Sequence, residues 1–225
     1  MNSLPPVSII CTTYFPCQAR IAVAEETLWS WVKNLYYEGE IHLIVSDDGS
    51  PLEWEPQKIW SGRISYTYQY RQGLGASLNK GYKRAFQTSP LAASFTDDWS
   101  LTEPLDITPW CIALLENETI GCVRLGPPHP NLTGTVEMIS SQWQGWGLRL
   151  NKGGYAYGDR PALYHERFFQ AYGPFEPGCS ALECVRLYDE KFTELPGPDV
   201  ILALPHPFYH LDSISLSDIE PVGDY

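Results

Sequence analysis

Two pairs of adjacent aspartates are the side chains in this sequence with the clearest capacity for chemistry. Asp47 and Asp48 follow an apolar run that starts at Ile41, and Asp97 and Asp98 follow a second run that starts at Ala92. Neighbouring carboxylates repel each other, so the pKa of one of them rises unless a cation or hydrogen-bond donors intervene. Because each pair stands where a strand is expected to end, the two pairs predict a site for a metal ion and a nucleotide.

The elements that must position these pairs follow from the apolar periodicity. Short connections between them indicate βαβ units with parallel strands, whose ligands bind outside the carboxyl ends of the strands. We therefore expect an α/β fold, a three-layer sandwich with a mostly parallel central sheet. In the first hundred residues we expect strands over 7–11, 41–45, 64–70 and 92–96, and helices over 18–37 and 74–88.

The pattern changes after residue 104. No internal repeat or clear linker separates the two parts, so we predict a single domain over 1–225, with a nucleotide half (1–104) and an acceptor half (105–225). The second half is expected to contain helices over 109–117, 160–171 and 181–192, strands over 121–125 and 200–204, and a hairpin arm within 138–150.

Composition limits the classes of function. The formal net charge of −12 argues against broad binding of nucleic-acid backbones, although residues 63–84 carry five Lys and Arg and no acid, which leaves a local basic groove possible. The six cysteines show no CxxC spacing, so a structural zinc site is not expected. No apolar run reaches the length of a membrane span, and no signal-peptide pattern opens the chain, so we expect a cytoplasmic protein.

Four short motifs occur in an informative order. They are VSIICTTY at 7–14, VSDDGS at 45–50, GLGASLNKG at 73–81 and TDDW at 96–99. Together they resemble the family 2 glycosyltransferases, which have the GT-A fold, closely in the first half of the chain and loosely in the second. The resemblance implies a metal-dependent enzyme that moves a sugar from a nucleotide-diphosphate sugar, with a UDP-sugar preferred, to an acceptor hydroxyl, and it favours inversion.

The resemblance assigns Asp47 and Asp48 to nucleotide recognition, since a carboxylate can accept the N3–H of a uracil-like base. A turn in which Asp and Gly merely suit the geometry is the structural alternative. A solvated helix face is an equally good interpretation of Lys80. The further residues that the resemblance places at the nucleotide-sugar are Thr12, Thr13, Tyr14, Arg71, Asn79 and Lys80.

Asp97–Asp98 takes the place of the DXD motif of the resembled family. Mg²⁺ or Mn²⁺ bridges carboxylates to substrate phosphates, so we expect Asp98 to bind the metal and Asp97 to hold the ribose or orient the site. The two acids are adjacent here, so Asp97 is the alternative ligand. Trp99 either packs beneath the sugar or belongs to the core. Some relatives supply a late histidine to the cation, and of His206 and His210 the latter is the better candidate.

An inverting transfer needs a base for the acceptor hydroxyl. In the resembled family this carboxylate lies on a helix of the acceptor half after a Gly-x-Phe segment. Glu183 is the first candidate here and Glu176 the second, and an ordinary solvated glutamate is the alternative for either.

Aromatic side chains of the second half could stack on a saccharide, a lipid-linked acceptor or a hydroxylated nucleobase in DNA. A nucleotidyltransferase is a rival class, but the glycine-rich basic signature expected after its first strand is absent from 11–20. A non-catalytic module that binds nucleotides or sugars is the third class. The aromatic candidates are Trp143, Trp146, Tyr155, Tyr157 and Tyr164.

Overall fold

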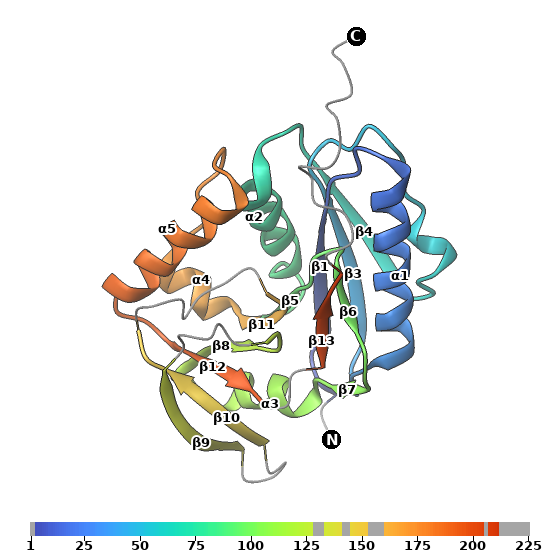
Figure 1. The fold of residues 1–225 in the computed structure, drawn as a ribbon. Coiled ribbons are helices and arrows are strands. Elements are labelled where there is room, and N and C mark those ends of the chain that lie inside the picture. The colour runs from blue at the N-terminus through green and yellow to red at the C-terminus, as the bar shows by residue number, and fades with distance from the viewer. Residues whose placement is uncertain (1–2, 128–132, 141–144, 153–159, 205–206, 212–225) are drawn as a thin grey trace.

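The computed structural model describes residues 3–127, 133–140, 145–152, 160–204 and 207–211, without the side chains of Ser140, Gly145 and Trp146. A nine-stranded sheet runs through the molecule with helices on both faces (Figure 1). The helices are α1 (Gln18–Asn34), η1 (Pro56–Lys58, a 3-10 turn), α2 (Gly73–Ala85), α3 (Thr108–Glu116), α4 (Glu166–Tyr172) and α5 (Ala181–Glu194). The strands are β1 (Val7–Thr13), β2 (Leu35–Tyr36), β3 (Ile41–Asp47), β4 (Arg63–Tyr68), β5 (Leu91–Ser94), β6 (Trp99–Leu101), β7 (Leu105–Asp106), β8 (Ile120–Arg124), β9 (Gly134–Ser140), β10 (Gly145–Leu150), β11 (Ala162–His165), β12 (Asp199–Ala203) and β13 (Phe208–His210).

The strands of the large sheet follow the order β4-β3-β1-β5-β11-β8-β12-β10-β9. The first four pair in parallel, with Thr13 of β1 opposite Asp47 of β3. In the rest of the sheet, β11 and β10 run against the direction that the other strands share. The expected α/β fold with a mostly parallel central sheet is confirmed.

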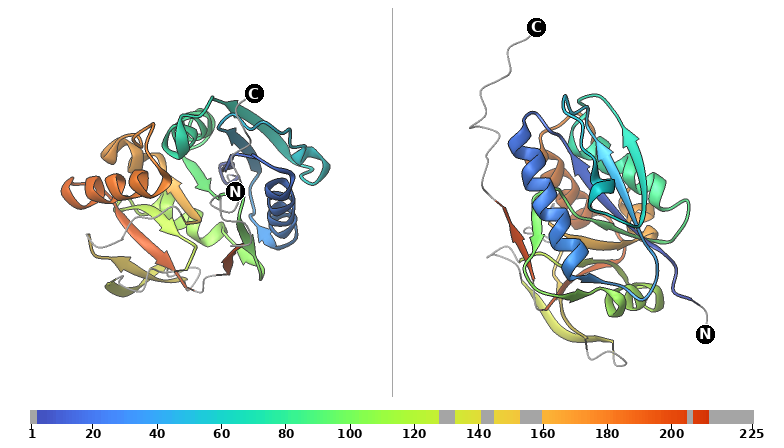
Figure 2. Two further views of the ribbon diagram at one scale, coloured as in Figure 1. Left: turned by 45° about the horizontal axis from the view of Figure 1, so that its top comes forward. Right: turned by 90° about the vertical axis from the view of Figure 1, so that its right-hand side faces the viewer.

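The core lies on both faces of β1, which explains its uninterrupted apolar sequence. Ile9 packs on one face with Leu28 and Trp31 of α1, whereas Ile10 packs on the other with Tyr82 of α2. Figure 2 shows α1 on one side of the sheet and α2, α4 and α5 on the opposite side. Burial on two faces fixes the sheet, so the residues just past the strand ends are held in place.

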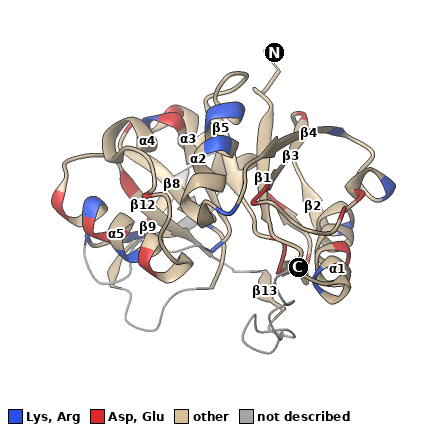
Figure 3. Cartoon of the chain, turned by 90° about the horizontal axis from the view of Figure 1, so that it is seen from above, with Lys and Arg blue, Asp and Glu red and all other residues tan. Residues whose placement is uncertain are grey.

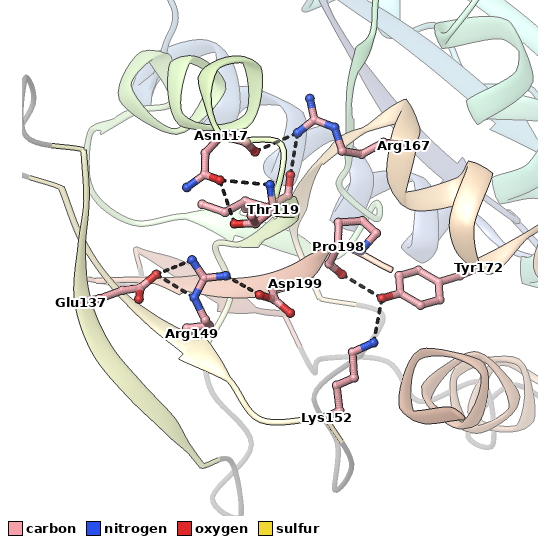
Figure 4. A network of polar contacts seen from close by, with 10 residues as sticks. Asn117, Thr119, Glu137, Arg149, Lys152, Arg167, Tyr172, Pro198 and Asp199 are labelled. Carbon is pink, nitrogen blue, oxygen red and sulfur yellow. Dashed lines mark hydrogen bonds and ion pairs between the residues drawn. The ribbon is translucent and has the colours of Figure 1, made fainter. Parts of the chain in front are cut away.

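A network of polar contacts holds the strands of the second half together (Figure 4). Arg167 at the start of α4 donates to the backbone carbonyls of Leu114, Asn117 and Ile120, which ties α4 to the end of α3 and to β8. Arg149 of β10 pairs with Glu137 of β9 and with Asp199 of β12. These side chains therefore serve to hold the fold together.

The expected helix over 160–171 is wrong at its start. Ala162–His165 forms strand β11 instead, between β5 and β8, and α4 begins only at Glu166. His165 caps α4 by accepting a hydrogen bond from the Arg167 amide at its Nδ1. A buried apolar run fits a strand or a helix equally well, and here pairing with two neighbours decides.

Four short strands were not expected from the sequence. β13 pairs with β6, and β2 pairs with β7 at the end of α1, which stops at Asn34 rather than at 37. The expected hairpin is present as β9 and β10 and begins earlier, at Gly134. In the parts of the chain that are described, no helix has both the length and the apolar character needed to cross a membrane.

Candidate functional site

Two adjoining pockets lie at the carboxyl ends of β1, β3 and β5. Their volumes are 350 and 300 Å³, and because Tyr14 and Asp48 line both of them, they form one cleft with an outer and an inner pocket. The outer pocket is lined by Tyr14, Asp48, Arg71, Gln72, Gly73, Gly178, Cys179 and Ser180. The inner pocket is lined by Thr12, Thr13, Tyr14, Arg20, Asp48, Leu74, Ser77, Thr96, Asp97, Asp98, Trp99, Ala181 and His210.

Asp47 is engaged by its own turn. Its Oδ1 accepts the backbone N–H groups of Gly49 (2.9 Å) and Ser50 (2.8 Å), and its Oδ2 accepts the hydroxyls of Thr13 (3.0 Å) and Ser50. Gly49 has φ +84°, the left-handed conformation that this tight turn requires. The structure gives Asp47 a turn-building role, and it lines neither pocket; its contact with a nucleotide stays a prediction.

Asp48 caps α2 from a distant loop. Its carboxylate accepts the backbone N–H groups of Gln72 (2.8 Å) and Gly73 (2.9 Å) and the side-chain amide of Gln69 (3.0 Å). A negative charge at a helix N-terminus is favourable because the unpaired amides there carry partial positive charge. Asp48 therefore faces both pockets while it fixes where α2 begins.

Asp97 is the most deeply buried acid of the site, with an exposed fraction of 5%. Its Oδ1 accepts from Arg20 Nη2 at 2.8 Å, but its Oδ2 has no hydrogen-bond partner within the described chain. Burial raises the pKa of Asp97 to about 7, against the lowering effect of Arg20 and with a further raising effect of Asp98. The Asp97 side chain lines the inner pocket, whereas this oxygen is itself buried and has almost no accessible surface.

Asp98 has the opposite pKa shift. Burial alone would raise its pKa, but hydrogen bonds from His210 and Thr96 outweigh that effect and lower it. Thr96 Oγ1 donates to Oδ1 at 2.8 Å, and His210 Nε2 lies 3.3 Å from Oδ2. Asp98 is thus the ionised acid of the pair and the better ligand for a cation.

The short strand β13 brings His210 to this place. His210 stands opposite Trp99 in the β13–β6 ladder, and the two rings lie 4.8 Å apart between centroids. The Leu211 amide donates to the Asp98 carbonyl at 2.8 Å, which fixes the end of β13 beside the aspartates. Trp99 therefore lines the inner pocket and also belongs to the packed layer beneath it.

Asp98 and His210 fit a divalent cation held jointly with a ligand. Two neighbouring positions of an octahedral Mg²⁺ site with bonds of about 2.1 Å are about 3.0 Å apart, close to the 3.3 Å between Asp98 Oδ2 and His210 Nε2. Among the residues that the structure describes, no group of three or more His, Cys, Asp or Glu could hold a metal by itself. Phosphate oxygens or water would have to complete the coordination, as is usual for Mg²⁺ at substrate phosphates.

Arg20 is a residue of the site that sequence reasoning missed. It lies in the first turn of α1, and its Nη2 is 2.8 Å from Asp97 and 3.7 Å from Asp98. A cation is unfavourable at a helix N-terminus, and this placement was the available signal in the sequence. The structure explains it by the two aspartates that Arg20 faces.

Tyr14 and Arg71 form one side of the outer pocket. The Arg71 guanidinium lies 5.5 Å from the centre of the Tyr14 ring. Arg71 also has φ +42°, a conformation that non-glycine residues rarely adopt. A planar ring with a cation above it suits a flat, anionic or heteroaromatic ligand.

Besides Asp47, four of the expected site residues line neither pocket. Asn79 exchanges two hydrogen bonds of 2.9 Å with the backbone of Phe175, so it joins α2 to the segment before α5. Lys80 is exposed and donates to the Tyr68 carbonyl at 2.9 Å. Glu176 and Glu183 are exposed and lie close to Ser180 and Ala181, the cleft-lining residues where α5 begins.

Several aromatic and histidine candidates lie outside the described residues, namely Trp143, Tyr155, Tyr157 and His206, together with the side chain of Trp146. Tyr164 is described and is 1% exposed; it packs against Tyr82 and Phe168 in the core. Its expected role in binding an acceptor is therefore wrong, because no part of its ring is available for stacking.

No protein-family model and no curated protein matches this sequence. Solved structures do match its fold. The chain is 14% identical to S. aureus TarS, with a TM-score of 0.60 over 91% of this chain and 36% of TarS. TarS 1–349 in complex with UDP-GlcNAc gives a TM-score of 0.56 over 94% of this chain and 62% of that one, at 14% identity.

GalNAc-T7 with UDP, GalNAc and Mn²⁺ is 16% identical, with a TM-score of 0.58 over 93% of this chain and 45% of that chain. The chain thus spans between about a third and three fifths of the lengths of these structures. Identities this low establish the fold alone. The chain has the GT-A fold, as do these glycosyltransferases.

Proposed function

We propose that this protein is a metal-dependent glycosyltransferase that moves a sugar from a nucleotide-diphosphate sugar to an acceptor hydroxyl. The observation that carries the proposal is the inner pocket, which Asp97 and the Asp98–His210 pair line together at the strand ends of a GT-A fold. A ligand with both hydroxyls and a diphosphate would use these groups.

A UDP-sugar is the donor that fits best. TarS was solved with UDP-GlcNAc and GalNAc-T7 with UDP, and this chain offers a cleft at the strand ends of the same fold. The outer pocket, with the Tyr14 ring and Arg71, would take the nucleoside, and Asp97, which lines the inner pocket, would contact a ribose or sugar hydroxyl. Thr12 and Thr13 line the inner pocket between these two positions.

Asp98 and His210 would hold Mn²⁺ or Mg²⁺, the former being the ion in the GalNAc-T7 structure. When bound, such an ion neutralises the diphosphate leaving group. Arg20 lies 3.7 Å from the same Asp98 oxygen and adds positive charge where the phosphates would lie. The hydrogen bond from Thr96 Oγ1 to Asp98 Oδ1 holds the carboxylate so that its other oxygen faces His210.

Glu183 would be the base that deprotonates the acceptor hydroxyl, and Glu176 is the alternative. Glu183 lies in the first turn of α5, whose N-cap residue Ser180 lines the outer pocket and whose first residue Ala181 lines the inner one. An acceptor that approaches over the start of α5 would reach the donor from that side, which suits inversion. The acceptor would be a saccharide or a hydroxylated nucleobase in DNA. The division of a single domain into a nucleotide half (1–104) and an acceptor half (105–225) stays a prediction, and so does its location in the cytoplasm.

The first test is a thermal-shift screen of UDP, GDP, CMP and their sugars with and without Mn²⁺. A ligand that binds only the folded state raises the free energy of unfolding by mass action, by about 2.7 kcal/mol at a hundredfold excess over Kd, and so raises the Tm. We expect UDP with Mn²⁺ to give the largest shift, and His210→Ala to remove the part that depends on Mn²⁺. If no nucleotide shifts the Tm with metal present, the proposal is wrong.

The second test concerns Glu183. Loss of a general base costs about 10²- to 10⁴-fold in rate, so Glu183→Gln should slow release of UDP from a UDP-sugar by that factor and leave the UDP-induced thermal shift unchanged. Glu194→Gln, at the other end of α5, is the matched control and should retain activity. A non-catalytic module would bind UDP and release none in any variant, whereas a nucleotidyltransferase would release pyrophosphate from a nucleoside triphosphate.

A further inference from the structure

The outer edge of the sheet carries a row of exposed tyrosines. Strand β4 is the edge strand, and Tyr66, Tyr68 and the following Tyr70 are exposed by 57%, 64% and 69%. Tyr66 and Tyr68 are two residues apart on a strand, so they lie on the same face about 6.7 Å apart. Exposed aromatic side chains in a row are an unusual use of surface on a monomer and mark a place where something binds.

Cations lie on the other side of the same strand. Lys80 of α2 donates to the Tyr68 carbonyl at 2.9 Å, which brings its charge to the strand itself. Burial lowers the pKa of His42, and Arg63 of β4 and Arg84 of α2 lower it further, so both guanidinium groups lie near that ring. Figure 3 shows the Lys and Arg positions of α2 on the part of the molecule next to β4.

Among the residues that the structure describes, no acid forms an ion pair with the Lys and Arg of this edge. Residues 63–84 carry five Lys and Arg and no Asp or Glu, in a chain whose formal net charge is −12. Of the acids nearby, Glu55 is paired with Lys58, and Glu40 is close enough to His42 to oppose the two arginines there. A positive segment within an acidic protein attracts a negatively charged partner, whereas the rest of the protein surface repels that partner.

We propose that this edge of β4 binds single-stranded nucleic acid, with bases stacked on Tyr66 and Tyr68 and phosphates contacting Arg63, Lys83 and Arg84. The tyrosine spacing of about 6.7 Å is twice the stacking distance of bases, about 3.4 Å, so one base fits between successive rings. A single strand carries bases on one side and phosphates on the other, as the edge carries rings on one side and cations on the other. A duplex keeps its bases inside and offers no ring to these tyrosines.

The edge continues toward the cleft. Tyr70 packs on the Gly49 turn, and Arg71 beside it lines the outer pocket. A strand bound along β4 would therefore end at the mouth of the cleft. The binding itself requires no sugar transfer and is tested without any sugar nucleotide, so its failure would leave the proposed function standing.

The test is fluorescence anisotropy with a fluorescein-labelled oligothymidylate of about 20 nucleotides, long enough to span the edge. Contacts to these three cations give a slope of log K against log salt of about −2, so affinity should fall about 20-fold between roughly 50 and 200 mM KCl. A duplex of the same length should bind at least tenfold more weakly. Equal or tighter binding of the duplex would overturn the proposal, and so would no anisotropy change with the single strand at low salt.

Two matched pairs of variants separate charge from stacking. Arg63→Gln/Lys83→Gln/Arg84→Gln should reduce the salt slope by about 2, whereas Lys33→Gln/Lys58→Gln/Arg186→Gln, with the same change in net charge, should leave it unchanged. Tyr66→Leu/Tyr68→Leu keeps apolar side chains on the strand and should weaken binding at least tenfold, and Trp29→Leu/Tyr36→Leu is its control. Circular dichroism checks that each variant is folded.

An oligomer with abasic sites in place of the bases should bind the native protein as weakly as the normal oligomer binds the tyrosine variant. If the abasic strand binds as tightly as the normal one, the tyrosines do not stack on bases and the proposal fails. Sedimentation at increasing protein concentration measures the competing occupant, a second copy paired through β4. A dimer that the tyrosine variant abolishes, together with unchanged binding of the oligomer, would assign this edge to self-association instead.

Discussion

The two pairs of aspartates have the same dipeptide and both stand near the carboxyl end of a parallel strand, yet the fold uses them in opposite ways. Every carboxylate oxygen of Asp47 and Asp48 accepts at least one hydrogen bond from the protein. In the second pair, Asp97 keeps one buried oxygen for which the described chain supplies no donor. The first pair builds turns, whereas both acids of the second pair line the inner pocket.

The difference arises from the residues that come directly after each pair. Gly49 and Ser50 turn back on Asp47 and present two amides and a hydroxyl to it. After Asp98 the chain enters strand β6 at once, and the amides of Trp99 and Leu101 donate to the Thr96 carbonyl (3.3 Å) and the Ser30 hydroxyl (2.8 Å) rather than to the carboxylates. Trp99 thus stands after the second pair where Gly49 stands after the first, and the negative charge of the second pair is left for Arg20, His210 and a ligand to neutralise.

The sharpest way to break the comparison is to remove one charge from the second pair. Asp98→Asn keeps the shape of the side chain but weakens its hold on a cation, so we expect release of UDP from a UDP-sugar to fall by about 10²- to 10³-fold. Glu103→Gln, an exposed acid two residues after β6, is the control and should be as active as the native protein. An Asp98→Asn variant with native activity would place the cation elsewhere.

The second prediction uses the pH dependence of stability. The pKa of Asp97 is about 7 in the folded protein, against an ordinary value of 3.8 that applies to the unfolded chain. Between pH 3.8 and 7 the folded state therefore holds a proton that the unfolded chain has released. The free energy of unfolding should therefore fall as pH rises from about 4 to 7, by at most about 4 kcal/mol. Urea unfolding at several pH values measures this change.

Asp97→Asn should remove this pH dependence, because the amide stays neutral and still accepts from Arg20. The variant should thus be more stable than the native protein at pH 8 and similar to it at pH 4. The difference between the two proteins isolates Asp97 from the other titrating groups. If both lose stability equally as pH rises, Asp97 is ionised in the folded state.

For the first pair we expect a loss of stability rather than of chemistry. Asp47→Ala removes the acceptor for two backbone amides and two hydroxyls, so it should reduce the free energy of unfolding by about 2–3 kcal/mol. Asp47→Asn retains one acceptor oxygen and should lose about half as much. An Asp47→Ala variant of native stability that has lost binding of UDP would reverse the roles inferred for the two pairs.

The smallest effect concerns the amide that Asp48 caps. Gly73 has φ +81°, and a Cβ there would lie 3.0 Å from the Cys179 carbonyl oxygen at the outer pocket, so Gly73→Ala should cost about 1 kcal/mol of backbone strain and weaken binding of UDP. Gly173→Ala has a similar φ, +75°, with nothing within 4 Å, and because Gly173 lines neither pocket it isolates the strain alone. Equal effects of the two on binding of UDP would show that the outer pocket does not take the nucleotide.

The sequence was sufficient for the first half of the fold. Strands β1, β3 and β5 are buried on both faces, and such strands read as apolar runs that end in polar residues. The α/β fold with a parallel sheet and the location of Asp48 and Asp98 at one edge of it follow from that pattern, whereas the GT-A fold was implied by the resemblance of the four motifs. The hydrogen bonds that separate Asp47 from Asp97 do not, because they depend on which amides and side chains return from distant segments.

Arg20 and β11 show the same limit. The contact between Arg20 and Asp97 joins residues 77 positions apart, and no local propensity indicates it. Ala162–His165 becomes a strand because β5 and β8 leave a place between them. Tertiary pairing overrides the helical periodicity of that segment, which is where sequence reasoning is weakest.

The pairing of β13 with β6 has a consequence for how the protein is made. His210 and the amide of Leu211 reach Asp98 from near the end of the described chain, whereas all the parallel strands at the cleft precede residue 95. During synthesis the sheet around β1 can form long before these groups leave the ribosome. A nascent chain would therefore form the cleft before it carries the His210 side chain that the proposed cation site requires.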